Sequence, residues 1–137
     1  MTADPFQLHD RLAADTALIV TWPLCQIRLM LDQTYPWLIL VPARTGLREL
    51  HELASQDRMT AMEEITRASR ALEGLHRPDK INIGAIGNMV PQLHIHIVAR
   101  FKTDPAWPSP PWGAVPPTPY TAAERDQAIT QLKEILQ

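Results

Sequence analysis

Apolar residues recur along this chain with two different periods. Within residues 55–75 they follow one another at three- and four-residue steps, at Ala61, Ile65, Ala68, Leu72 and Leu75. This spacing gathers them on one side of an amphipathic helix, which predicts that the helix covers one face of a sheet. Shorter apolar runs predict strands at residues 17–20, 26–31, 37–42, 80–87 and 93–100.

Local signals place two further helices near the ends of the chain. Asp4 followed by Pro5 predicts a short helix over residues 6–14, with Asp4 as its N-cap. Thr121 and Glu124 have the spacing of a capping box, which predicts a terminal helix.

The order of these elements decides between two kinds of sheet. Residues 32–36 are turn formers between two strands, so those strands should form a hairpin. The strands do not alternate regularly with helices, as they would in a doubly wound parallel sheet. We therefore expect an α+β fold with a mainly antiparallel five-stranded sheet and one long covering helix.

Proline changes the character of the chain after residue 104. Seven of the 13 prolines fall in residues 105–119, together with Trp107 and Trp112. This composition predicts a semi-rigid arm. We expect residues 1–104 to form a ligand-binding domain and residues 105–137 to pack on that same domain as an arm and a terminal helix.

Composition and charge narrow the function classes. Apolar residues make up 45% of the 137 and the formal net charge is −2, which predicts one folded domain. The sequence pI near 6.2 gives no electrostatic support for binding to nucleic acid or to an anionic membrane. The uncharged stretch at residues 81–99 is interrupted by polar residues and does not predict a membrane span.

Cys25 is the single cysteine of the sequence, which excludes an intramolecular disulfide and a thiolate zinc cluster. Its apolar neighbours favour a small core residue over a nucleophile. The first residues lack the pattern of a secretory signal. These features predict a protein of the cytoplasm.

Polar and apolar residues alternate strictly in residues 92–97. On a strand this alternation places Gln92, His94 and His96 in a row on one face, about 6.5 Å apart. Imidazole can act as a nucleophile, a base, a metal ligand or, when protonated, a donor to phosphate. Alternation alone does not choose among these roles, nor does it exclude an ordinary solvated strand face.

The surroundings of this row resemble the signature of the histidine triad (HIT) family, in which three histidines alternate with apolar residues. An Asn82-Ile83-Gly84 strand and a small polar loop at residues 87–91 precede the row, as in that family. Residues 35–42 resemble its central strand. The resemblance covers about residues 16–100 and implies an enzyme that acts on nucleotides.

Carried over by position, the resemblance implies that His94 is the nucleophile. It would attack the α-phosphorus and form a transient nucleotidyl-imidazole, while His96 donates a hydrogen bond to the phosphate or the leaving group. This covalent route needs neither metal nor cofactor. Family members commonly dimerise by joining sheets, so the resemblance also implies a homodimer.

The resemblance implies further ligand contacts. Asn82 matches an asparagine that contacts phosphate or ribose, and Asn88 matches a loop residue that binds phosphate. Met89 stands where many members have serine or threonine, so only its backbone N–H can serve. Asp32 occupies a position that often binds the ribose hydroxyls.

Two residues depart from the family pattern. Gln92 replaces the first histidine, and an amide can orient a phosphate but cannot deliver a proton near neutral pH. Trp37 stands where some members have a histidine that supports the nucleophile. The candidate activity is hydrolysis of dinucleoside polyphosphates or nucleoside phosphoramidates, and the non-enzymatic alternative is a nucleotide-binding regulator.

Other residues suggest less specific chemistry. The His-x-His pair could hold zinc in a metal-dependent hydrolase, with a third ligand from His9, His51, His76 or a carboxylate, but none has diagnostic spacing. Two tryptophans of the arm would either stack on a base or simply pin the arm to the domain. We expect Arg44 and Arg100 to be solvated surface charges.

Overall fold

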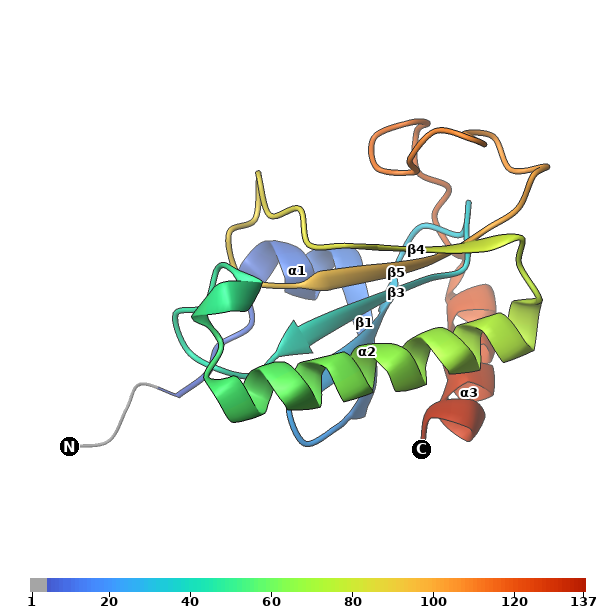
Figure 1. The fold of residues 1–137 in the computed structure, drawn as a ribbon. Coiled ribbons are helices and arrows are strands. Elements are labelled where there is room, and N and C mark those ends of the chain that lie inside the picture. Colours follow the sequence, from blue (N-terminus) through green and yellow to red (C-terminus); the bar gives the residue numbers. More distant parts are fainter. Residues whose placement is uncertain (1–4) are drawn as a thin grey trace.

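The computed structural model describes residues 5–137, which form one five-stranded sheet with helices on its two faces (Figure 1). The elements, in chain order, are α1 (Asp10–Asp15), β1 (Thr16–Thr21), β2 (Cys25–Met30), β3 (Trp37–Pro42), a 3₁₀ turn (Leu50–Glu52), α2 (Ser55–His76), β4 (Lys80–Gly84), β5 (Ile95–Arg100) and α3 (Ala122–Leu136). The strand order is β1-β2-β3-β5-β4, and every neighbouring pair is antiparallel. The expected α+β class and five-stranded antiparallel sheet are confirmed.

Helix α2 covers one face of the sheet, as its apolar spacing predicted (Figure 1). Its buried residues pack on the alternate side chains of the two central strands, among them Leu38 and Leu40 of β3 and Ile95 and Ile97 of β5. Leu132 and Leu136 of α3 join the same core. This face is apolar almost throughout, which gives the fold its main hydrophobic stabilisation.

One carboxylate lies within this apolar layer. Glu64 of α2 is 6% exposed, and its two oxygens accept hydrogen bonds from the backbone N–H groups of Leu24 and Cys25, at 3.0 and 2.8 Å. The buried carboxylate thus fixes the start of β2 against α2. Cys25 is fully buried here, and burial, followed by the charge of Glu64, raises the pKa of its thiol. The expectation of a core cysteine is confirmed.

The opposite face carries a second cluster, which contains Leu12 of α1 and side chains of β3 and β5: Trp37, Ile39, Val41 and Val98. Figure 1 shows α1 behind the sheet and α2 in front of it. Strands β3 and β5 are interior strands of the sheet, and their side chains on this face are enclosed by α1, the N-terminal segment and the arm. This face positions the candidate site.

Three element boundaries differ from the prediction by two residues or more, and the others by one residue at most. The first helix begins at Asp10 instead of residue 6, because the His9 side chain caps it by accepting a bond from the Arg11 N–H. The predicted cap Asp4 lies outside the described residues. Strand β4 ends at Gly84 instead of residue 87, and β5 begins at Ile95 instead of residue 93.

The arm runs from β5 to α3 without helix or strand and is fastened at both ends. Asp104 accepts from three backbone N–H groups at its start, those of Phe101, Ala106 and Trp107. Near its end the Thr118 backbone bonds to Asp32 and Gln33. The capping box at Thr121 and Glu124, which opens α3, is confirmed. None of the helices in the described part of the chain is long and apolar enough to cross a membrane.

Candidate active site

His94 and His96 lie side by side on the enclosed face, with ring centroids 5.1 Å apart. Their sequence neighbours Leu93, Ile95 and Ile97 point into the opposite, α2-side core. The two imidazoles are 7% and 8% exposed, so each ring is largely withdrawn from water. Burial of this degree requires that the ring nitrogens have defined partners.

The Nδ1 atom of His94 lies 2.7 Å from the backbone carbonyl oxygen of Gln92. A carbonyl oxygen can only accept, so in this bond Nδ1 carries the proton and donates. The neutral ring then has its lone pair on Nε2. His94 is therefore held in the tautomer that a nucleophile acting through Nε2 requires.

His96 is held in the opposite tautomer by a different partner. The indole N–H of Trp37, on the neighbouring strand β3, donates to its Nδ1 at 3.0 Å. An indole nitrogen can only donate, so Nδ1 of His96 has no proton and Nε2 has one. Burial, and to a lesser extent the adjacent His94, lowers the pKa of His96 from its ordinary 6.5 to about 4. His96 is thus a neutral N–H donor at physiological pH.

Aromatic side chains enclose this pair of histidines. Trp37 packs edge-on against Tyr35, with centroids 6.0 Å apart, and Trp112 of the arm packs edge-on against His96 at 5.7 Å. A Cβ atom placed on Gly84 would lie 2.9 Å from the Trp112 ring, so glycine is required where the arm crosses β4. This contact explains the glycine of the Asn82-Ile83-Gly84 strand.

Gln92 lies just before β5, and both ends of its amide bond to the N-terminal segment. Its Oε1 accepts from the His9 backbone N–H and its Nε2 donates to the Gln7 carbonyl, both at 2.8 Å. These partners fix the orientation of the amide, because one can only donate and the other can only accept. One N–H of Nε2 remains for another contact. The side chain at this position therefore anchors residues 7–9.

Asn82 faces the site from β4 and is tied to a buried ion pair. Its Oδ1 accepts from Arg100 at 2.8 Å, which leaves the amide N–H groups without a partner in the described structure. Arg100 is 1% exposed and pairs with Asp104 at 2.8 Å. The expectation that Arg100 is a solvated surface charge was wrong. Bonds from Arg100 and from three backbone N–H groups lower the pKa of Asp104 to about 2.

The remaining predicted site residues form no hydrogen bond with either histidine in the part of the chain that the structure describes. Asp32 is buried, and its Oδ1 accepts from the N–H groups of Thr34 and Thr118 and from the Thr34 hydroxyl. These bonds hold the turn and the end of the arm. Asn88 and Met89 are exposed in the loop between β4 and β5, with Met89 84% exposed. The structure thus brings together the two histidines and Trp37 but leaves this loop open.

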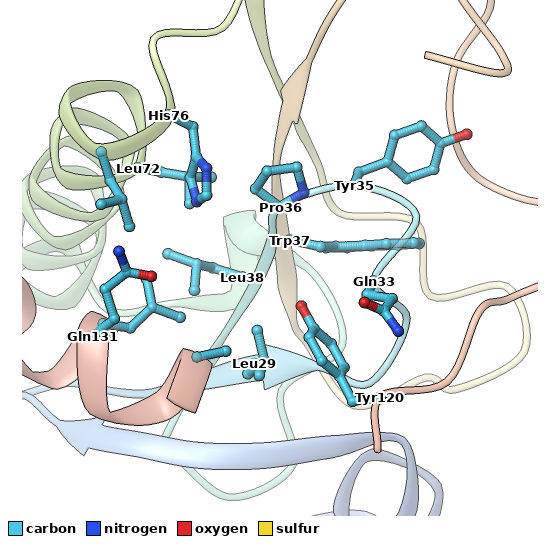
Figure 2. A pocket seen from close by; sticks show the side chains of 13 residues that line it. Leu29, Gln33, Tyr35, Pro36, Trp37, Leu38, Leu72, His76, Tyr120 and Gln131 are labelled. Carbon is cyan, nitrogen blue, oxygen red and sulfur yellow. The ribbon is translucent and has the colours of Figure 1, made fainter. Parts of the chain in front are cut away.

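Two hollows lie near these residues. One of about 320 Å³ is lined by Pro5, Phe6, Gln7, Thr45, Gly46 and Gln92, and so adjoins the start of the histidine row. A second, of about 200 Å³, lies between β3, the end of α2 and α3 (Figure 2). His76 and Tyr120 lie on opposite sides of it, and Trp37 forms part of its wall. Trp37 thus borders this second hollow and also bonds to His96.

The geometry also bears on a metal site. Within residues 5–137, no three side chains of histidine, cysteine, aspartate or glutamate lie close enough together to hold a metal ion. Nδ1 of each site histidine is already occupied by a protein partner. The described donors therefore amount to two Nε2 atoms, fewer than the three protein ligands of a typical zinc site.

Three features of the site were missed by sequence reasoning. They are the bond from Trp37 to His96, the anchoring of the N-terminal segment by Gln92, and the buried pair of Arg100 and Asp104. The sequence did contain a signal for the buried pair of Arg100 and Asp104. Arg100 continues the alternation of His94, His96 and Val98 onto the enclosed face, and the carboxylate four residues later is its natural partner.

Known proteins resemble this chain in sequence and in structure. The HIT domain model matches residues 11–103. A histidine triad protein from Bradyrhizobium japonicum is 42% identical and superposes with a TM-score of 0.94 over 98% of this chain and all of its own. One from Marinobacter aquaeolei is 44% identical, with a TM-score of 0.94 over 97% of each chain.

A third solved structure, a histidine triad protein from Sinorhizobium meliloti, is 41% identical, with a TM-score of 0.92 over 96% of this chain and 97% of its own. These three likenesses extend over the arm and α3 as well as the sheet. No curated protein sequence matches the chain significantly.

Proposed function

The chain belongs to the HIT family, and on that basis we propose that it is a nucleotide hydrolase or transferase acting at the α-phosphorus through His94. Family membership by itself supports nucleotide binding or hydrolysis in general. The observation that carries the finer proposal is the bond between His94 Nδ1 and the Gln92 carbonyl. It leaves an Nε2 lone pair on a buried, oriented imidazole.

The proposed reaction has two steps. The lone pair of His94 Nε2 attacks the α-phosphorus, the bond from phosphorus to the leaving group breaks, and the leaving group takes the electron pair. Water then attacks the nucleotidyl-imidazole, the P–N bond breaks, the lone pair returns to Nε2, and the proton that the water loses passes to the solvent. Another nucleophile in place of water would give transfer.

Donors around the phosphate would stabilise the charge of both transition states. We assign this role to Nε2–H of His96 and to the unpartnered amide N–H groups of Asn82. Asn88 and the backbone N–H of Met89 would approach from the open loop. Gln92 contributes at most its one remaining N–H.

The substrate candidates are dinucleoside polyphosphates and nucleoside phosphoramidates. The hollow beside Gln92, of about 320 Å³, is where we place part of such a ligand, because it adjoins the histidine row and is lined by polar as well as apolar groups. The Oδ1 atom of Asp32 already accepts three bonds within the protein. Asp32 is therefore our candidate for the ribose contact by its family position alone.

We further propose a homodimer formed through the edge strand β4. Ile83 on β4 is 50% exposed, Ile86 just after it is 45% exposed, and Met62 on the adjacent face of α2 is 60% exposed. A hollow of about 280 Å³ runs between this helix face and β4. Analytical ultracentrifugation of Ile83→Lys against the native chain tests this: a monomeric variant supports the β4 interface, and an unchanged dimer contradicts it.

One observation favours a second candidate function, a nucleotide-binding regulator without turnover. Gln92 occupies the first position of the histidine row and is fastened to the N-terminal segment. A site of this kind would bind nucleotides while releasing leaving groups slowly. It would bind AMP or GMP with the same affinity in the native chain and in His94→Ala.

The deciding experiment uses a panel of dinucleoside polyphosphates and nucleoside phosphoramidates, with and without EDTA. Release of a nucleoside monophosphate that EDTA does not reduce supports the proposal. Rapid quenching followed by intact mass spectrometry should show one nucleotidyl group on the native protein and none on His94→Ala. Loss of turnover with EDTA would favour a metal-dependent hydrolase, and binding without turnover would favour the regulator.

A further inference from the structure

Among residues 5–137, the candidate site has no side chain that can hand a proton to a departing group. His96 is held with Nδ1 as acceptor by the Trp37 N–H, at 3.0 Å. To become an imidazolium it would need a proton on Nδ1, and two N–H groups would then face each other across that short distance. Trp37 thus opposes protonation of His96 by direct contact, in addition to the burial of the ring.

The side chain at position 92 does not supply the missing proton donor. The Gln92 amide does not titrate, and its two bonds to the backbone of residues 7 and 9 hold it in place. His94, the remaining titratable ring in contact with His96, is the proposed nucleophile and must be unprotonated to attack.

The other charged or titratable groups on this face are committed to partners or shielded. Arg100 and Asp104 form a buried pair farther along β5 and into the arm. Tyr35 packs against Trp37 and below the Arg100 guanidinium, and burial followed by the charge of Asp104 raises the pKa of its hydroxyl. Trp112 of the arm, the further aromatic neighbour of His96, has no acidic proton to give.

We propose that Trp37 is a positioning residue that keeps His96 a neutral Nε2–H donor, and that the site therefore acts on nucleotides whose leaving group departs as a stable anion, a phosphate or a carboxylate, and not on those with amine leaving groups. This inference rests on the proposed function. It narrows the substrate class to nucleotidyl anhydrides, in which the α-phosphate is joined to another phosphate or to a carboxylic acid.

The proton balance of the first step explains why anhydrides are favoured over phosphoramidates. When His94 Nε2 attacks an anhydride, the P–O bond breaks and the electron pair stays on the departing oxygen as a phosphate or carboxylate anion, which needs no proton. When it attacks a phosphoramidate, the P–N bond breaks and the nitrogen must take up a proton as it leaves. Without a donor this second route is slow. His96 can stabilise the phosphate charge in both cases but cannot supply that proton.

The position of Trp37 is well defined by its surroundings. It is 6% exposed, touches Tyr35 and His96, and forms part of the wall of the hollow in Figure 2. A histidine at this position would carry both a donor and an acceptor and could pass a proton. Tryptophan carries the donor alone. The departure from the family pattern therefore has a chemical consequence at His96.

The first test is NMR of the ¹⁵N-labelled protein, which needs no substrate. In the native chain His96 should show a protonated Nε2 and an unprotonated Nδ1 and should stay neutral at pH 5. In Trp37→Phe the tautomers should mix, and the pKa of His96 should rise by a unit or more. Trp107→Phe, which changes an arm tryptophan near Arg100, is the control. A protonated Nδ1 in the native chain, or an unchanged His96 in a folded Trp37→Phe, would overturn the role of Trp37.

The second test compares kcat/KM for an adenylyl carboxylate, a dinucleoside polyphosphate and an adenosine phosphoramidate. We expect the two anhydrides to be at least about 100-fold better substrates than the phosphoramidate, and this ratio to narrow in Gln92→His and in Trp37→His, which each introduce an imidazole. Equal turnover of both classes would overturn the inference while leaving His94 as nucleophile. Turnover of neither class would overturn the proposed function and the substrate class with it, and the NMR result would still decide whether Trp37 positions His96.

Discussion

The two faces of strands β3 and β5 are made from alternate residues of the same segments, yet one is an apolar packing surface and the other carries hydrogen-bonded polar groups. On the α2 side, Leu38, Leu40, Ile95 and Ile97 meet other apolar side chains and form no hydrogen bond through their side chains. On the other side, Trp37, His96 and Arg100 form a connected polar and aromatic cluster, with Asp104 and Asn82 as partners.

This difference separates stability from chemistry within one sheet. The α2-side face depends on shape and volume, so its residues are exchangeable for others of similar size. On the histidine face each polar group depends on one specific neighbour, because a buried donor or acceptor without its partner is costly. Substitutions on the two faces should therefore affect different measured quantities.

The largest expected effect is on the rate, from His94→Ala. Removing the nucleophile should lower kcat/KM for nucleotidyl substrates by at least about 1,000-fold, while nucleotide binding and the unfolding midpoint stay nearly unchanged. His51→Ala, which changes an exposed histidine, is the matched control and should keep full activity. Retention of more than a few per cent of the native activity in His94→Ala would contradict the assignment.

The second-largest expected effect is a loss of stability, caused by a substitution on the α2-side face. Leu40→Ala removes a fully buried side chain and should lower the free energy of unfolding by about 3 to 4 kcal/mol, through lost burial and the cavity left behind. Its kcat/KM per folded molecule should stay within about twofold of the native value. Urea denaturation measures the first quantity, and Met59→Ala, at a residue 63% exposed, serves as the control. A large loss of activity in folded Leu40→Ala would show that the two faces are coupled.

A smaller effect should appear as a dependence of stability on pH. Burial lowers the pKa of His96 to about 4, whereas in the unfolded chain it is about 6.5. Between these values the unfolded chain binds a proton that the native protein does not, so stability falls as pH drops through this window. His96 should contribute a loss of roughly 1 to 2 kcal/mol between pH 6.5 and pH 5.

This contribution is measured as the difference in urea denaturation between the native chain and His96→Asn at the two pH values. The window lies above the range in which Asp104, with its pKa lowered to about 2, would lose its own stabilising charge. His51→Asn should leave the native slope unchanged. An equal slope in His96→Asn would mean that His96 does not remain neutral in the native protein.

The smallest effect concerns the anchor of the N-terminal segment. Gln92→Ala removes two bonds from a partly exposed amide to the backbone of residues 7 and 9, and should cost about 1 kcal/mol of stability. Hydrogen exchange at the His9 amide should speed up, because this N–H loses its acceptor. Gln127→Ala on the exposed side of α3 is the matched control. Unchanged exchange at His9 would show that Gln92 does not hold this segment.

Much of the architecture follows from periodicity alone. The helix expected at residues 55–75 is α2, and the strand expected at residues 37–42 is β3 with the same bounds. Apolar spacing succeeds here because it reflects which side of an element is buried, and that is a local property of the chain. The first helix was placed too early, since the segment before Asp10 is held by Gln92, a residue 83 positions away from His9.

Alternation and helical spacing are properties of consecutive residues, and they are enough to predict the sheet, its covering helix and the row that puts His94 and His96 on one face. Three features are set by tertiary contacts: which nitrogen of His96 carries a proton, the burial of Arg100 beside Asp104, and the position of Trp112 over Gly84. Each of these depends on a partner from another strand, the arm or the segment that follows β5. A hydrogen bond or ring contact is fixed by distance and direction in space, and the sheet and the arm must be in place before either exists.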